Sequence, residues 1–449
     1  MIFWNCNTIS IHRLWRLFIL LVAAITLLQQ EQYVDCFATS SYSSSFDLNV
    51  QSYYKRFQKF STKPYDAPHI TKILLLSDLH MDYAANQQWL HNLCTSSNNT
   101  NHEKEEEDDY TQTLIIVAGD VSHDIEILQW TFQTLQRFAE VVYTPGNHEL
   151  WLDKKRNTTT TNTNKICQSS GKGDGCTNSI EKLERVLQCC LDNNIHIGPV
   201  KVSPSNNDTP LWVIPLLSWH HESFDTEPQI ECWDGIPSAR RVVSDYYRTT
   251  WPQPLSQQDD SVAEFLDGLN DVILDLEELK NDNNNNGSIL TVSHFLPRIE
   301  LIPEKRYLTL PTLHSSVGST YLESRLRQLR SSCGKSDDKD KDDHLHAFGH
   351  SHLSWDLIID GVRYVHVPLA YPREWQQRRG SLEIGTMQGE ESDLRHPVCI
   401  WDGSLIEDEC ITGFPKDWLG GWWSKYYDVI PREPHRNKEL APWAAKRFR

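Results

Sequence analysis

The chain has 449 residues, of which 39% are hydrophobic and sixteen are tryptophan, and this composition excludes a disordered chain. Its length is enough for one large domain or two modest ones. The formal net charge is −18, so no duplex nucleic acid partner is expected, because such binding needs cations that neutralise phosphates.

The N-terminus has the form of a targeting signal. Two arginines precede Leu17–Leu28, a run that is apolar except for one threonine and is shorter than the roughly 20 residues of a membrane-spanning helix. We therefore predict a signal over residues 1–38, a secretory or extracellular protein, and no stable membrane span after cleavage. An uncleaved signal anchor is one alternative. Because a Phe and a Ser-rich stretch follow, a two-part plastid signal is another.

Cysteines and sequons agree weakly with an oxidising compartment. Of eleven cysteines, two lie in the signal, and among the remaining nine the spacing would allow loop disulfides between Cys167 and Cys176 and between Cys399 and Cys410. Buried free thiols explain the same residues equally well. Four N-x-[ST] sequons lie in polar stretches typical of surface loops, at Asn98, Asn157, Asn207 and Asn286.

After a polar lead-in at residues 39–70, strands alternate with helices. Apolar runs predict strands at 72–77, 113–118, 141–143, 211–217 and 289–292, and helical periodicity predicts helices at 86–94 and 124–139. This alternation indicates an α/β sheet. Beyond residue 343 the chain becomes β-rich, with strands predicted at 345–348, 355–359 and 363–367 and a hairpin turn at Asp360-Gly361.

The domain boundaries follow from the interruptions of this pattern. We predict one folded domain over residues 71–405 and a Trp-rich extension over 406–449, which is too aromatic for a free tail and is expected to pack across the domain. Four low-complexity inserts are predicted to be solvated loops, at 96–109, 157–164, 282–286 and 335–343.

Five predicted strands end in Asp, Asn or His, and in open α/β sheets the strand ends are where ligands bind. The candidate ligands are Asp78, His80, Asp120, Asn147, His294, His350 and His352. We expect strand alternation to turn the i, i+2 pairs to one side. Singly, each residue is more often a cap or turn residue. Together they form a mixed nitrogen and oxygen set that suits Mn, Fe or Zn, and that fits two ions sharing a carboxylate.

These residues lie in motifs that resemble the calcineurin-like metallophosphoesterase family over roughly residues 72–370. The motifs are Asp78-x-His80, Gly119-Asp120, Gly146-Asn147-His148-Glu149, His294 and Gly349-His350-x-His352. Two further segments, 218–224 and 368–374, look like a plant and algal branch of that family. The resemblance implies an α/β fold with a four-layer α/β/β/α sandwich of two packed mixed β-sheets.

The resemblance also implies the roles of the site residues. One ion would be held by Asp78, His80, Asp120 and His352, and the other by Asp120, Asn147, His294 and His350, with Asp120 bridging. His148 would face the leaving group as a general acid or as a cation beside the phosphoryl group.

Two departures separate the chain from the protein phosphatases of that family. The residue three after Asp120 is His123, where those enzymes have an acid, and a His there is similar to the nuclease-like branch. Leu150 and Trp151 follow Glu149, where those enzymes have an Arg that grips phosphate. His123 is therefore a candidate catalytic residue, with a plain helix-start role as the alternative.

Two more histidines, His220 and His221, follow the strand predicted at 211–217. We predict His221 as a candidate substrate contact, although a supporting role behind the site is the more common one for such residues.

The sequence thus predicts a metal-dependent phosphoric ester hydrolase in which a hydroxide bridging two divalent ions attacks phosphorus. Its substrate would be a small phosphate ester or a nucleotide. One alternative is a phosphodiesterase specific for nucleotides or other diesters, and another is a non-catalytic metal-binding scaffold. The scaffold is disfavoured because no predicted ligand is missing, and the chain has no P-loop, GxSxG or HExxH motif.

Overall fold

The structure is a computed structural model that describes residues 44–96, 112–137, 139–152, 166–167, 173–203, 210–230, 235–281, 288–332, 344–374, 397–403 and 422–446. The predicted signal, the four sequons, Cys410 and, apart from Ser96, the four polar inserts lie outside these residues and stay predictions. The chain divides into two compact units, Met1–Ser52 and Tyr53–Arg449. Apart from residues 44–52 of the first described helix, the features described below belong to the second unit.

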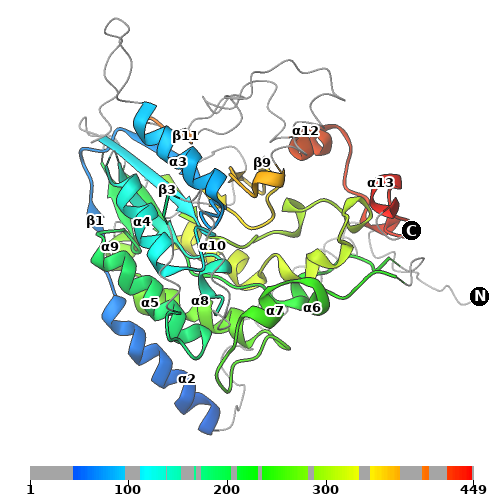
Figure 1. Cartoon of the computed structure of the whole chain (residues 1–449), viewed down its shortest axis with the longest axis horizontal. Coiled ribbons are helices and arrows are strands. Elements are labelled where there is room, and N and C mark those ends of the chain that lie inside the picture. The colour runs from blue at the N-terminus through cyan, green and yellow to red at the C-terminus, as the bar shows by residue number, and fades with distance from the viewer. Residues whose placement is uncertain are drawn as a thin grey trace, which may run out of the picture. The chain divides into compact units, whose positions relative to one another are not determined.

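Two β-sheets form the centre of this unit (Figure 1). The strands are β1 (Tyr65–Asp66), β2 (Lys72–Leu76), β3 (Thr113–Ala118), β4 (Glu140–Thr144), β5 (Val200–Val202), β6 (Leu211–Pro215), β7 (Ser288–Val292), β8 (His344–Phe348), β9 (Trp355–Ile359), β10 (Val362–His366) and β11 (Val398–Trp401). One sheet has the order β11-β2-β3-β4 and the other β1-β5-β6-β7-β8-β10-β9. Both mix parallel and antiparallel pairs.

The core lies between the sheets, because the side chains that form it come from strands of both. Ile73, Leu114 and Val142 of the four-stranded sheet share one buried cluster with Val213 and Leu290 of the seven-stranded sheet. Strand β3 is buried along its whole length, as its continuous apolar run predicts for a central strand. The predicted fold class, two packed mixed sheets with helices outside, is confirmed.

The helices are α2 (Ser44–Phe57), α3 (Ala84–Ser96), α4 (Ile125–Leu135), α5 (Ser179–Asp192), α6 (Ala239–Val242), α7 (Asp245–Arg248), α8 (Ser261–Ile273), α9 (Glu277–Asn281), α10 (Thr320–Ser332), α12 (Trp422–Val429) and α13 (Pro442–Ala445). Helix α4 is shorter than predicted. It begins after Asp124, whose side chain accepts hydrogen bonds from the backbone N–H groups of Glu126 and Ile127. The hairpin turn at Asp360-Gly361 is confirmed, and both residues have positive φ, as a tight β-hairpin requires.

The described part of the Trp-rich extension packs against the domain. The indole of Trp443 stacks on Tyr307, with ring centroids 5.8 Å apart. The buried carboxylate of Glu227 pairs with the Arg432 guanidinium and accepts a 2.8 Å hydrogen bond from Asn437 Nδ2. The extension is thus fastened by an ion pair that is largely removed from water.

Cys167 and Cys176 are not bonded to each other, so the disulfide allowed by their spacing is not formed. Each is held by a different partner: the backbone N–H of Cys167 donates to Gln87 Oε1, and that of Cys176 donates to Asp174 Oδ1. In the described residues, no helix has the length and apolarity that a membrane crossing requires.

The buried ion pair generates a stability prediction. Arg432→Met should lower the free energy of unfolding by about 3–5 kcal/mol, because it leaves the Glu227 carboxylate buried without its cation. Arg436→Met is the matched control, since Arg436 pairs with Glu433 at the surface and should matter little. Denaturant unfolding of both variants measures the difference. Equal, small effects would show that the buried pair does not hold the extension.

Candidate metal centre

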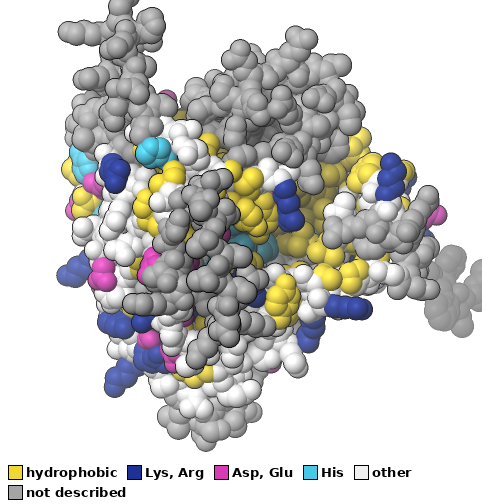
Figure 2. All heavy atoms as spheres, in the orientation of Figure 1, with side chains coloured by type: hydrophobic (Ala, Val, Ile, Leu, Met, Phe, Trp, Pro, Cys, Tyr) yellow, Lys and Arg dark blue, Asp and Glu magenta, His cyan; other side chains and the backbone are white. Residues whose placement is uncertain are grey.

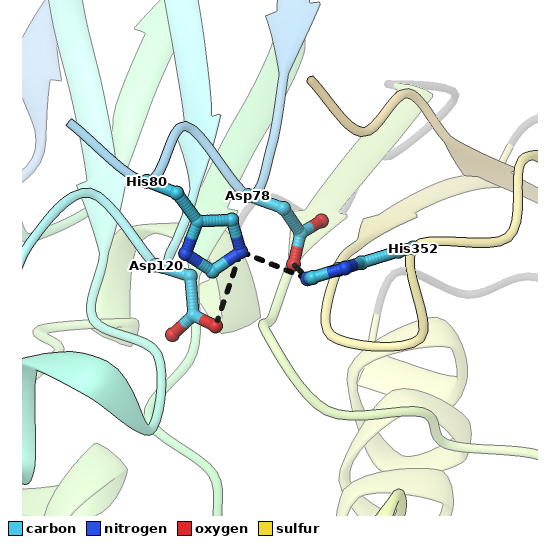
Figure 3. Close-up of side chains that lie close together, drawn as sticks. All are labelled: Asp78, His80, Asp120 and His352. Atoms are coloured by element: carbon cyan, nitrogen blue, oxygen red, sulfur yellow. Dashed lines mark hydrogen bonds and ion pairs between the residues drawn. The ribbon is translucent and has the colours of Figure 1, made fainter. Parts of the chain in front are cut away.

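The loops that follow β2, β3, β4, β7 and β8 meet at one edge of the two sheets and bring the predicted ligands together. One group contains Asp78, His80, Asp120 and His352 (Figure 3), and a second contains Asp120, His294 and His350. Within each group, one donor atom from each residue lies within 4.8 Å of the others. Asp120 belongs to both groups, as expected of a carboxylate shared by two ions.

The backbone delivers these side chains in a way that the sequence analysis did not foresee. Strand β2 already ends at Leu76, so strand alternation does not align Asp78 with His80. Instead, positive φ angles of 44° to 75° occur at Asp78, His80, Asp120, His350 and His352. For a residue with a side chain this conformation costs about 1–2 kcal/mol, and such strain is typical of functional sites.

Hydrogen bonds between the loops hold this strained backbone. The N–H of His80 donates to the carbonyl of Asp120 at 2.8 Å. The N–H of His350 donates to Asp78 Oδ1, also at 2.8 Å. Gly146 lies so close to Asp120 that an added Cβ would fall 2.3 Å from Asp120 Oδ1. The loops therefore fix one another, and glycine is required where they touch.

Three of the histidines have one ring nitrogen engaged outside the centre. His294 Nδ1 lies 2.9 Å from the carbonyl oxygen of Ala118, and His350 Nε2 lies 3.0 Å from that of Ser316. His352 Nδ1 lies 2.9 Å from Glu374 Oε2. Such outer partners fix the tautomer and direct the other nitrogen inward, as they do for histidines that bind metals.

The inward atoms have the spacing of neighbouring ligands. His80 Nε2 and His352 Nε2 are 2.8 Å apart, and Asn147 Oδ1 lies 3.0 Å from both His294 Nε2 and His350 Nδ1. Ligands at about 2.0–2.2 Å from an ion lie about 3 Å from each other. The chemistry and spacing of these donors therefore fit divalent transition metals.

The electrostatics of the centre also favour cations. Burial by itself raises the pKa of the Asp78 carboxyl, but the hydrogen bond from His366, at 2.8 Å, and the charge of His352 hold that pKa well below its usual value. Burial lowers the pKa of His294, yet the Asp120 carboxylate outweighs this effect and raises it to about 10. Two buried carboxylates thus stay ionised and attract positive charge.

Glu149 supports the shared ligand. Its carboxylate accepts hydrogen bonds from the backbone N–H groups of Asp120, Val121, Ser122 and Gly146. It therefore ties the loop after β3 to the loop after β4 at the point where Asp120 enters the centre. Burial and the nearby Asp120 carboxylate raise the pKa of Glu149 to about 7, against the effect of these N–H groups.

His148 lies beside the centre without belonging to either group. Its Nε2 atom lies 3.7 Å from Asp120 Oδ2 and 3.2 Å from the Tyr371 hydroxyl. Its ring packs on the indole of Trp151, with centroids 3.6 Å apart. Burial lowers the pKa of His148 to about 4. This placement fits the role that the family resemblance implies, a histidine facing the substrate.

His123 lies one step further out. Its Nδ1 atom is 3.1 Å from Asp82 Oδ1, and Ser122 Oγ donates to the same oxygen at 2.8 Å. Burial raises the pKa of Asp82, but the charges of His123 and His148 both lower it. The Asp82 carboxylate therefore interacts electrostatically with both histidines.

The structure does not bring His221 to the centre. Its buried ring is held by Ser223 at one nitrogen and by Thr320 at the other, so it supports the fold behind the site. The Nε2 atom of its neighbour His220 lies 3.3 Å from Asp245 Oδ2.

Asp245 is a supporting residue that sequence analysis missed. Its Oδ1 atom accepts from Asn147 Nδ2 at 2.8 Å and from Trp151 Nε1 at 2.7 Å, and its side chain is fully buried. One carboxylate therefore orients the amide of Asn147 and the ring that packs on His148. Tyr371 and Glu374 lie within the segment 368–374, which resembles the family, whereas no sequence pattern marks Asp245.

Comparison with known protein families identifies the family of this chain. The family model for calcineurin-like phosphoesterases matches residues 71–380, and the chain belongs to this family. The resemblance inferred from the motifs is thereby confirmed, and the chain is a metal-dependent phosphoester hydrolase. The plant and algal branch stays a prediction.

The relatives are distant. The acyl-carrier-protein phosphodiesterase PptH of Mycobacterium tuberculosis is 24% identical over 309 residues, covering 68% of this chain and 79% of PptH. The crystal structure of the phosphopantetheinyl hydrolase PptH from that organism has a TM-score of 0.44 at 19% identity, covering 70% of this chain and 94% of that one. The crystal structure of a putative 5′-nucleotidase from Staphylococcus aureus has a TM-score of 0.26 at 13% identity, covering 66% of this chain and 48% of that one.

A first prediction for the centre concerns its shared carboxylate. Asp120→Asn should weaken metal binding in both groups and abolish turnover, because it removes the charge common to them. Metal content by mass spectrometry and hydrolysis of a chromogenic ester check this outcome. Normal metal content together with full activity would rule out a shared ligand.

A second prediction concerns Asp245. Asp245→Ala should weaken metal affinity about 10–100-fold, the usual cost of removing an outer-shell partner. Asp245→Asn keeps an acceptor for Asn147 and Trp151 and should retain most of the affinity. Competition with a metal-binding dye measures both variants. If Asp245→Ala binds metal as tightly as the wild type, the orienting role is wrong.

Proposed function

We propose that the chain is a phosphodiesterase that uses two divalent ions, with Mn, Fe or Zn as the candidates. Asp78, His80, Asp120 and His352 would hold one ion, and Asp120, Asn147, His294 and His350 the other. When bound, the ions would activate a water molecule and neutralise negative charge on the phosphoryl group. The proposal rests on the donors of four loops that form the two groups around Asp120, and on Asn147 of a fifth loop, whose Oδ1 atom lies 3.0 Å from both His294 and His350.

One observation carries the choice of a diester. Trp151 packs on His148 near the place where the protein phosphatases of the family have a phosphate-gripping arginine. Tyr371 contacts the same imidazole through its hydroxyl. An aromatic wall suits a diester, which has one negative charge fewer than a monoester dianion and carries a second organic arm. On the face drawn in Figure 2, hydrophobic side chains line part of a hollow that has histidine at its floor.

The distant relative supports the same choice, because its name describes a phosphodiesterase acting on an acyl-carrier protein. We infer that this chain hydrolyses a phosphodiester in which one of the two ester groups is large, like a group that is attached to a carrier protein. Nucleotide diesters are the second candidate, favoured by the position of His123 beside Asp82 near His148. The secretory destination rests on residues 1–38 alone and remains a separate proposal.

In this assignment His148 acts on the leaving group. The Asp120 carboxylate and the Trp151 ring hold the imidazole in place, and its Nε2 atom, on the side of Asp120, would face the ester. A histidine so placed gives a proton to the departing oxygen or stabilises its charge.

The test compares matched substrates and one variant. The wild type should hydrolyse bis(4-nitrophenyl) phosphate with a kcat/KM at least about tenfold above that for 4-nitrophenyl phosphate. His148→Ala should retain its metal and lose about 10²–10⁴-fold in kcat, as expected on removal of a general acid. A clear preference for the monoester would overturn the diester assignment. Loss of metal in His148→Ala would overturn the role of that residue.

A further inference from the structure

Tyr371 belongs to a short segment that is fastened directly to the loop carrying Asp78. Ala370 donates its N–H to the carbonyl of Asp78 at 2.9 Å, and the carbonyl of Ala370 accepts from Asn86 Nδ2 at 3.0 Å. The N–H of Tyr371 donates to Glu374 Oε2, the atom that also contacts His352. The position of Tyr371 is therefore set by residues that belong to, or directly support, the candidate metal centre.

The turn into Tyr371 is strained. Ala370 has a φ of 65°, a left-handed conformation that costs about 1–2 kcal/mol for a residue with a Cβ. The conformation changes the direction of the chain immediately before Tyr371. Strain of this kind persists where the surrounding structure enforces it, and it occurs preferentially at functional sites.

The ring of Tyr371 is held from several directions. Its centroid lies 4.2 Å from that of His80, with the rings 28° from parallel, and the Arg373 guanidinium lies 5.1 Å from the Tyr371 centroid. Tyr83 meets the ring with its edge at 5.4 Å. The hydroxyl lies 3.2 Å from His148 Nε2. A fixed ring thus presents one polar atom beside the imidazole assigned to the leaving group.

We propose that Tyr371 is a further catalytic residue whose hydroxyl donates a hydrogen bond to a phosphoryl oxygen of the substrate, next to His148. A phenol is a neutral donor at neutral pH, so it stabilises negative charge that develops on the phosphoryl group without transferring a proton. The hydrogen bond to His148 keeps the hydroxyl oriented until the substrate takes its place. This role rests on the proposed diester hydrolysis and adds a donor that the family motifs do not supply.

The matched pair of variants is Tyr371→Phe and Tyr83→Phe. Both remove one hydroxyl from neighbouring tyrosines and keep the rings, but Tyr83 is 46% exposed and its side chain meets the edge of the Tyr371 ring. The Tyr83 N–H that donates to the His80 carbonyl belongs to the backbone and is kept in the variant. Tyr371→Phe should lower kcat for bis(4-nitrophenyl) phosphate about 10²-fold, the usual effect of losing one such donor. KM, metal content and melting temperature should stay near wild-type values. Tyr83→Phe should keep wild-type activity.

Inhibition by orthovanadate gives a second readout that a merely structural role would not change. Vanadate takes the shape of the phosphoryl group in the transition state, so its inhibition constant should rise in Tyr371→Phe by a factor similar to the loss in kcat. Equal activity and equal vanadate inhibition in the two variants would overturn the proposal. So would loss of metal from Tyr371→Phe, since the hydroxyl would then support the centre only. A wild-type enzyme that hydrolyses no diester would contradict the proposed function instead.

Discussion

The arrangement depends on burying the carboxylate of Asp120 at the meeting point of two sheet edges. An isolated buried carboxylate is costly, and this one is compensated from several sides. The backbone N–H of His148 donates to Asp120 Oδ1 at 3.0 Å, and His294 Nε2 lies 3.4 Å from the same oxygen. Because these partners come from different strands, the charge of one residue links the loops that carry the other candidate ligands.

This linkage explains why the loops accept strained backbone. Left-handed conformations at residues such as Asp78 and His352 turn their side chains toward one point. In a regular strand, these side chains would be spread along the edge of the sheet. The packing of the core between the sheets thus offsets the free-energy cost of the strained backbone at the centre. Outer partners such as Glu374 and Asp245 then fix the direction of individual donor atoms. The chemistry of the site is consequently distributed over many segments of the domain.

Much of this was predictable from the sequence, and what was missed has identifiable causes. Strands such as β3 and β6 are largely apolar runs bounded by turn residues, so their positions follow from the pattern of apolar residues. The candidate ligands follow from motif order. Left-handed backbone at His80 has no local signal, because it is imposed by contacts between loops. The role of Asp245 and the separation of Cys167 from Cys176 depend on which distant segments become neighbours, and so do the contacts that hold the His221 ring.

The central claim is that this centre holds two divalent ions and works through them. Its most direct test is the metal content of purified wild-type enzyme, followed through removal and stepwise return of Mn, Fe or Zn while diester hydrolysis is measured. The account predicts about two ions per chain, loss of hydrolysis when they are removed, and recovery that is complete only after the second equivalent. Full hydrolysis by a metal-free enzyme, or full recovery with a single equivalent, would contradict it.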